Sequence, residues 1–278
     1  MGQPVVLVEN FFSGIQYPDH TISAEEEASG HPVERLANGR RSTDDYWTAT
    51  TTNSSTWVKV QCDRVRAANM LVLDRGHNLA GKTITIECSQ DNFTTTHTIK
   101  SAITIPASSS PGAVTDTSGV LTEEGAWVIQ FDLRAALYWR VTIPAMGSGL
   151  KPNIVGLWLG LALTLDWPDL PLDDDADELI VDLTQSDAGW IGNSQAANRR
   201  KGGLVLKLNG HAAYDAVRLM LQGHYGMGRP CWLLHDSEQA DRALLVRRPS
   251  NDQGFRFDTG WGWRQGTLDY IEHEPRWP

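Results

Sequence analysis

The sequence has 278 residues, of which 41% are hydrophobic and 21% are charged. These fractions are near globular averages and exclude a wholly disordered or fibrous chain, while the length predicts two domains. The 24 Lys and Arg are outnumbered by 34 Asp and Glu, so the formal net charge is -10, which disfavours binding to nucleic-acid phosphates. We therefore expect a folded two-domain protein without a nucleic-acid partner.

The chain carries three cysteines, Cys62, Cys88 and Cys231, an odd number without C-x-x-C or zinc-ligand spacing. We expect buried free thiols. No stretch approaches the ~18 uninterrupted apolar residues of a membrane span, and no charged leader followed by an apolar run opens the chain. The sequence predicts no metal site, no cofactor and no membrane insertion.

Short segments of alternating apolar and polar residues dominate the first part of the chain, and each is typical of a β-strand. Turn-forming residues such as Asn38-Gly39 and Ser89–Asn92 separate them. The expected strands are Trp57–Val60, Met70–Leu73, Thr83–Glu87, Trp127–Phe131, Tyr138–Ile143 and Ile154–Leu163. Short strands with turn signals and no helical window predict a β-sandwich.

A domain boundary is predicted near residue 165, which divides the chain into residues 1–165 and 166–278. The prolines of Asp166–Pro171 and the acidic run Asp173–Glu178 indicate a linker or crossover. The acidic run has enough carboxylates for a calcium ion. It lacks a glycine turn and regular ligand spacing, so solvated linker charge is the favoured interpretation.

The second domain is predicted to be β-rich with one amphipathic helix, Asn209–Gln222, whose apolar residues have helical spacing. Asn209 is a suitable N-cap, and Gly223 is suitable after the last helical residue. The expected strands are Leu179–Leu183, Leu204–Leu208, Cys231–Leu234, Ala243–Val246, Phe255–Phe257 and Thr267–Ile271.

Read in order, segments of the first part resemble the discoidin-type family, coagulation-factor C-terminal jelly-roll sandwiches that bind sugars or lipid head groups. The segments are Asn38-Gly39, Tyr46–Ala49, Trp57–Gln61, Ile86–Phe93, Tyr138–Ile143 and Ile154–Leu159, within residues 30–163. The family's Asp-Leu is replaced by Gln61-Cys62, and the disulfide that joins the ends of many members has no place here. The resemblance implies a galactose-binding-like β-sandwich without implying the family's ligand pocket.

The second part is similar to the β-barrel-with-helix domain of siphophage distal tail and tail-tube-like proteins. The similarity rests on Gly202–Leu208, the helix after it, Gly226–Asp236 and Thr267–Ile271. In that group one domain forms a ring while added modules face outward. The resemblance therefore implies a homo-oligomeric ring in the tail tip or baseplate.

Eleven tryptophans are an unusual number, and aromatic faces packed against apolar sugar surfaces are a common basis of glycan recognition. Trp57, Trp127 and Trp139 are in expected strands and are predicted to be core residues. Trp47 is the better ligand candidate, in a loop with neighbouring acids, and a second polar loop could join it. The candidate glycan ligands are Asp44, Asp45, Tyr46, Trp47, Arg75, His77 and Asn78. Core or interface packing of the tryptophans, and an ordinary turn for the second loop, are the favoured interpretations.

A second set of candidate residues crowds the C-terminal end of the chain: Trp261, Trp263, Arg264 and Trp277. Enrichment in Trp and Arg is typical of protein–protein interfaces. Packing within the monomer explains the same residues equally well.

The sequence contains no nucleophile elbow, H-E-x-x-H helix or Walker loop, so we expect no enzyme. The leading hypothesis is a structural protein of a phage tail tip, made in the host cytoplasm and incorporated into the virion. Its expected partners are itself, neighbouring tail-tube and tail-tip proteins, and a host surface glycan. The alternative is a lectin-like carbohydrate-binding protein, and the third hypothesis is a glycan hydrolase with paired carboxylates on facing strands.

Overall fold

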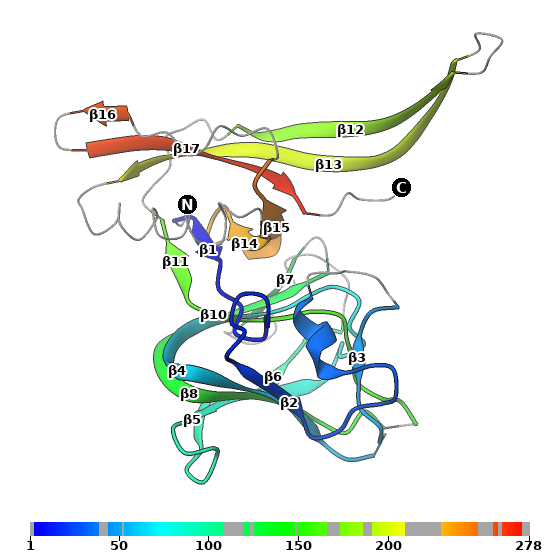
Figure 1. The fold of residues 1–278 in the computed structure, drawn as a ribbon, viewed down its shortest axis with the longest axis vertical. Coiled ribbons are helices and arrows are strands. Elements are labelled where there is room, and N and C mark those ends of the chain that lie inside the picture. The colour runs from blue at the N-terminus through cyan, green and yellow to red at the C-terminus, as the bar shows by residue number, and fades with distance from the viewer. Residues whose placement is uncertain are drawn as a thin grey trace. The chain divides into compact units, whose positions relative to one another are not determined.

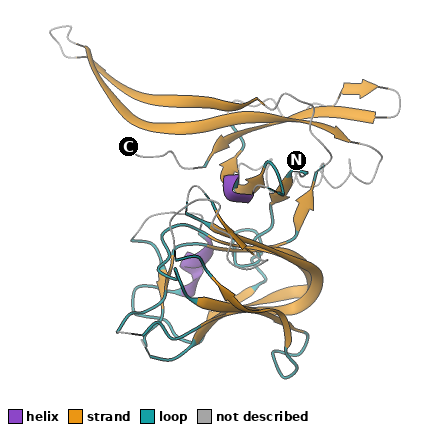
Figure 2. Ribbon diagram, turned by 180° about the vertical axis from the view of Figure 1, so that it is seen from behind, coloured by secondary structure: helices purple, strands orange, loops and turns teal. Residues whose placement is uncertain are grey.

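The computed structural model describes residues 3–38, 44–51, 53–107, 119–122, 125–147, 149–165, 173–185, 191–208, 229–238, 240–249, 258–260 and 263–273. The chain forms two compact units. Unit 1 consists mainly of Leu7–Leu163 and Leu234–Ala243, and unit 2 of Gly2–Val6, Thr164–Leu233 and Leu244–Pro278. Antiparallel strands make up most of the described chain (Figure 2), which confirms the expected mainly β fold class.

Unit 1 is organised by two long strands, β4 (Thr56–Leu73) and β8 (Trp127–Ile143), which pair with each other along most of their length. Its other elements are β2 (Thr21–Ala24), η1 (Val33–Ala37), β3 (Trp47–Thr48), β5 (Thr83–Ser89), β6 (His97–Thr104), β7 (Gly119–Leu121), β9 (Asn153–Ile154), β10 (Leu157–Gly160) and η4 (Ala240–Arg242). Both long strands curl strongly along their length (Figure 1). Their register shifts between Gln61 and Arg66, where the pairing is irregular.

The two halves of these long strands have different neighbours. Around Thr56–Gln61 the order is β2, β4, β8, β5 and β6, whereas around Met70–Leu73 strand β4 lies between β10 and β8, with β7 on the far side of β8. Bulges and irregular register allow strands to bend and change layer. Unit 1 is therefore a β-sandwich whose layers share two continuous strands.

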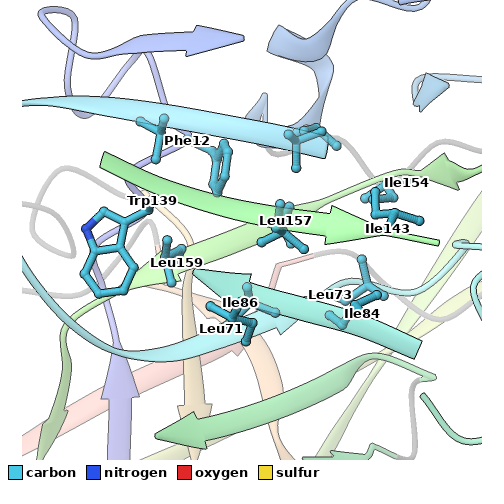
Figure 3. Close-up of a cluster of buried hydrophobic side chains, with 14 of the residues drawn as sticks. Phe12, Leu71, Leu73, Ile84, Ile86, Trp139, Ile143, Ile154, Leu157 and Leu159 are labelled. Atoms are coloured by element: carbon cyan, nitrogen blue, oxygen red, sulfur yellow. The ribbon is translucent and has the colours of Figure 1, made fainter. Parts of the chain in front are cut away.

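Alternation of buried and more exposed side chains along Thr56–Gln61 of β4 and Tyr138–Ile143 of β8 builds one part of the core of unit 1. Four side chains are almost wholly buried: Val58 and Val60 of β4, and Trp139 and Val141 of β8. The residues between them along each strand are more exposed. Side chains from β4, β5, β8 and β10 and from Phe12 meet in one cluster (Figure 3). Full burial of such side chains contributes about 1.5–3 kcal/mol each relative to exposure, so this cluster dominates the stability of the unit.

Unit 2 is built on an antiparallel sheet in which β12 (Asp173–Gln185) and β13 (Ile191–Leu208) form a long hairpin (Figure 1). The strand order is β11-β1-β14-β15-β17-β13-β12, and β16 pairs with β17. The remaining bounds are β1 (Val5–Leu7), β11 (Ala162–Thr164), β14 (Cys231–Leu234), β15 (Leu244–Arg247), β16 (Asp258–Gly260) and β17 (Trp263–Glu272).

The structure corrects the sequence interpretation at the acidic run. Asp173–Glu178 is not a linker, because it forms the first part of β12 and pairs with β13 opposite Arg199, Arg200 and Lys201. The expected helix Asn209–Gln222 and the expected strand Phe255–Phe257 lie outside the described residues.

Gly160 provides a test of packing in unit 1. A Cβ at this position would collide with the backbone carbonyl oxygen of Glu9, which cannot rotate away as a side chain can. We expect Gly160→Ala to lower the free energy of unfolding by about 1–3 kcal/mol, measured from the midpoint of urea denaturation. Gly14→Ala is the matched control, since nothing lies within 4 Å of its added Cβ. Equal midpoints for the two variants would contradict the packing described here.

Candidate functional site

The two loops expected to bind a ligand converge on strand β9. Trp47 and Thr48 pair with Ile154 and Asn153. The side chain of Asn78 donates to the carbonyl oxygen of Lys151 at 2.7 Å and accepts from the amide of Asn153 at 2.8 Å. The structure therefore brings Trp47 from the first loop and Asn78 from the second to the same short strand, which sequence spacing could not show.

Trp47 is nevertheless a core residue. Its side chain is 0% exposed, and its indole N–H donates to the carbonyl oxygen of Glu26 at 3.3 Å. A ring buried in this way offers no face to a ligand. The structure therefore agrees with core packing of Trp47 and not with a ligand-binding role.

The neighbours of Trp47 are engaged with one another. Arg35 donates to the carbonyl oxygen of Asp44 at 3.0 Å and forms an ion pair with Asp45 at 3.3 Å. Asn38 donates to the second carboxylate oxygen of Asp45 at 2.6 Å, and Tyr46 stacks on His31 with ring centroids 4.1 Å apart. These contacts organise the loop, and they occupy much of the hydrogen-bonding capacity that a sugar would need.

The side chains of the second loop, Arg75–Asn78, and of Asp74 before it also form hydrogen bonds with the backbone. Nδ1 of His77 accepts the amide hydrogen of Leu79 at 3.1 Å, and burial lowers the pKa of His77 to about 4. The imidazole is therefore neutral at neutral pH, as an acceptor must be. The amide of Arg75 donates to the Asp74 carboxylate at 2.8 Å, so this loop is tied down at both ends.

The expected interface residues lie at one end of β17. Trp263 pairs with Gly260, and Arg264 pairs with Thr259 of β16 and Leu208 of β13. Trp261 and Trp277 lie outside the described residues.

An aromatic and charged surface lies instead on the outer side of the β4–β8–β5 layer. We call this surface the outer face: Trp57, Lys59, Glu87, Asn92, Phe93, Tyr138, Arg140 and Thr142. The backbone register places Lys59 beside Arg140 and Arg140 beside Glu87. Because successive side chains of a strand point to opposite sides, burial of Val58, Val60, Trp139 and Val141 directs their neighbours outward.

The prediction that Trp57 is a core residue is wrong. Trp57 alternates with the fully buried Val58 and is only partly buried itself. The same alternation was visible in Trp57–Gln61, where valines occupy every second position, so the pattern could have assigned Trp57 to the outer face.

A tight turn after β5 adds Asn92 and Phe93 to the outer face. The Ser89 hydroxyl oxygen accepts the amide hydrogens of Asp91 and Phe93 at 3.1 and 3.0 Å, and the Asp91 carboxylate accepts the amide hydrogen of Thr95 at 2.9 Å. Asn92 and Phe93 have φ values of 54° and 65°, a left-handed conformation that costs free energy in a bulky residue. The hydrogen bonds hold this conformation and direct the Phe93 ring toward β8.

The rings and charges of the outer face contact one another. The guanidinium of Arg140 lies 4.0 Å from the Phe93 ring centroid, and the Phe93 and Tyr138 rings meet edge to face at 6.4 Å. Arg140 also donates to Glu87 at 2.8 Å, and the Thr142 hydroxyl donates to the same oxygen at 3.0 Å. These contacts place aromatic faces beside fixed donors and acceptors, an arrangement suited to recognising polar ligands with apolar surfaces.

A separate pocket of about 310 Å³ opens at the same turn. Its lining is Cys88, Ser89, Gln90, Asp91, Thr95, His97, Arg134, Ala135 and Ala136. Burial raises the pKa of the Cys88 thiol, so the sulfur is protonated at neutral pH and is a poor nucleophile.

All three cysteines are buried and free, which confirms the expected thiols. Burial raises the pKa of both Cys62 and Cys231 to about 12. Within the part of the chain that the structure describes, no cluster of three His, Cys, Asp or Glu could hold a metal ion. The described residues likewise include no helix with the length and apolar character needed to cross a membrane.

Comparison with solved structures finds several carbohydrate-binding modules, and also a GH29 fucosidase from Ruminococcus gnavus. Chitosan-binding module 1 of a chitosanase/glucanase from Paenibacillus sp. IK-5 matches with 18% identity and a TM-score of 0.40, over 54% of this chain and 98% of the module. CpGH89CBM32-5 from Clostridium perfringens, in complex with GalNAc-β-1,3-galactose, matches with 10% identity and a TM-score of 0.38, over 51% and 96%. A pectin-binding module matches with 12% identity and a TM-score of 0.39, over 53% and 93%.

No family model matches the sequence. No curated protein matches it either.

The Asp91 carboxylate gives the turn a pH dependence. Hydrogen bonds from Thr95 and then from Ser89 lower the pKa of Asp91 below its ordinary value. A lowered pKa in the folded state means that the ionised group stabilises the fold at neutral pH, and that this stabilisation is lost as the pH falls through the acid range. We expect Asp91→Asn to lower the urea midpoint at pH 7 and to differ less from the unsubstituted protein at pH 3. Asp132→Asn, at an exposed position of β8, is the control. A difference that does not depend on pH would show that the Asp91 charge is not involved.

Proposed function

We propose that unit 1 is a non-catalytic carbohydrate-binding module whose sugar lies on the outer face. The observation that carries this proposal is the contiguity of Trp57, Phe93 and Tyr138 with the polar side chains of the same face. Sugar rings have apolar faces bordered by hydroxyls, so an aromatic surface beside fixed donors and acceptors satisfies both parts of the ligand.

Rigidity supports the same proposal. Phe93 is held by the Ser89 turn, and Arg140 is held by Glu87 and by the Phe93 ring. Side chains that are already ordered lose little conformational entropy when a ligand binds. The outer face therefore needs no rearrangement of its backbone to accept a sugar.

The contacts of Glu87 argue against a catalytic role for the outer face. Glycoside hydrolysis commonly uses two carboxyl groups, one of which must be able to donate a proton. Glu87 already accepts hydrogen bonds from Arg140 and Thr142, both at the same carboxylate oxygen. We therefore assign Glu87 to positioning Arg140 and not to acid catalysis.

The proposal is tested with a glycan array followed by calorimetry on the full-length chain. We expect Trp57→Ala to weaken binding of any captured glycan by at least tenfold, because stacking on the indole is lost, while Tyr46→Ala, in the β9 loops, leaves the affinity unchanged. Thermal melts of both variants confirm that they are folded. Loss of binding in Tyr46→Ala alone would move the site to the β9 loops, and an array without any captured glycan would refute the proposal.

A second candidate function concerns unit 2. We propose that it joins copies of this chain, and neighbouring tail-tube and tail-tip proteins, in a phage tail tip where unit 1 contacts a host glycan. One structural observation favours assembly: β12 is a 13-residue strand at the end of the sheet order, paired on one side with β13. An edge of this length presents backbone groups that a second chain can satisfy.

Assembly is tested on virions. We expect antibodies against this chain to label the tail tip of purified particles, and we expect a density map of the tail to contain several symmetry-related copies. A pulldown from purified protein alone is a weaker test, since ring closure can require the tail tube as a template. A single copy in the map, or the absence of the chain from purified particles, would refute this second function.

A further inference from the structure

Lys59 differs from Arg140, the other cation of the outer face, because no carboxylate among the described residues pairs with it. Its ammonium donates to Oδ1 of Asn92 at 2.9 Å and lies 5.1 Å from the centroid of the Trp57 ring. Arg140, the cross-strand neighbour of Lys59, is neutralised by Glu87 at 2.8 Å. Among the described ion pairs of the face, the charge of Lys59 is therefore left uncompensated.

The position of this cation beside Trp57 affects any ligand that covers the indole. An ammonium has three N–H donors, and only one is used by Asn92. A sugar stacked on Trp57 would displace water from Lys59, and removing water from an unpaired charge is costly. A neutral sugar offers the Lys59 ammonium only neutral acceptors, whereas a carboxylate accepts a charge-assisted hydrogen bond that is roughly twice as strong.

One acidic side chain borders this part of the face. Glu25 follows β2, is exposed, and its amide donates to the carbonyl oxygen of Trp57 at 3.0 Å. The rest of the chain is also acidic, with a net charge of -10. The net negative charge of the chain would therefore repel an acidic ligand. Any preference for acidic sugars must come from local contacts at Lys59.

We propose that the outer face recognises acidic glycans, in which a uronic acid carboxylate binds Lys59 while its sugar ring stacks on Trp57. This inference rests on the proposed carbohydrate-binding function and narrows it to one chemical class. Lys59 supplies the charge and Trp57 the apolar surface. Asn92, fixed by the Ser89 turn, orients the ammonium between them.

The test compares matched pairs of oligosaccharides on the full-length chain by calorimetry. The probes are tetramers of galacturonate, mannuronate and glucuronate, each beside its carboxyl-reduced neutral counterpart. We expect at least one acidic tetramer to bind, and to bind about tenfold more tightly than its neutral counterpart at low salt. The difference should shrink as salt is raised, because the ligand charge is partly exposed.

Two variants separate a local contact from general charge. Lys59→Met keeps an apolar stem and should remove the preference for the acidic tetramer, while Lys151→Met removes the same charge from the loop before β9 and should preserve it. Glu25→Gln should strengthen binding of the acidic tetramer. If each neutral tetramer binds as tightly as its acidic counterpart, the inference is wrong and the carbohydrate-binding function stands. If no tetramer binds, the inference is wrong, and the glycan array decides separately whether the carbohydrate-binding function stands.

Discussion

The register between β4 and β8 is the constraint on which the rest of unit 1 depends. Val58 and Val60 lie opposite Val141 and Trp139, and all four are buried, so their neighbours must point outward. A slip of one residue would expose the valines and bury a lysine and an arginine, which costs far more than the lost hydrogen bonds. The same pairing that forms the core therefore also brings Lys59 beside Arg140 on the outer face.

The turn after β5 holds a strained backbone conformation and places Phe93 on the outer face. Phe93 has a φ of 65°, a conformation that costs on the order of 1–3 kcal/mol for a residue with a side chain. The Ser89 hydroxyl and the Asp91 carboxylate offset this cost with hydrogen bonds to three backbone amides. The Phe93 ring is thereby held with its centroid 4.0 Å from the guanidinium of Arg140.

The strands of unit 1 were largely predictable from the sequence, because valine and isoleucine at every second position of Trp57–Val60 and Thr83–Glu87 have one simple structural explanation. The residues of the candidate site were not predictable from the sequence. Trp47 follows a loop-like sequence and is fully buried, whereas Trp57 lies in a strand and is partly exposed, so residue type and element do not decide burial. The convergence of the two expected loops depends on β9, a two-residue strand too short to leave a sequence pattern. The acidic run Asp173–Glu178 was misinterpreted for a related reason, since β13, the strand that pairs with it, follows only after the hairpin turn.

The outer face and the core occupy alternate positions of the same strands, so a change of ligand preference need not change the fold. Lys59, Tyr138 and Arg140 have partly exposed side chains, and their substitution leaves the buried valines and Trp139 in contact. Glu87 is the exception, because it holds Arg140 and Thr142 together from a third strand and its loss would leave the guanidinium without its anion. Under the proposed function, the preference for a ligand charge is set at Lys59, whose only polar partner in the described chain is the side chain of Asn92, while Arg140 and Glu87 act as a fixed pair that maintains the surface.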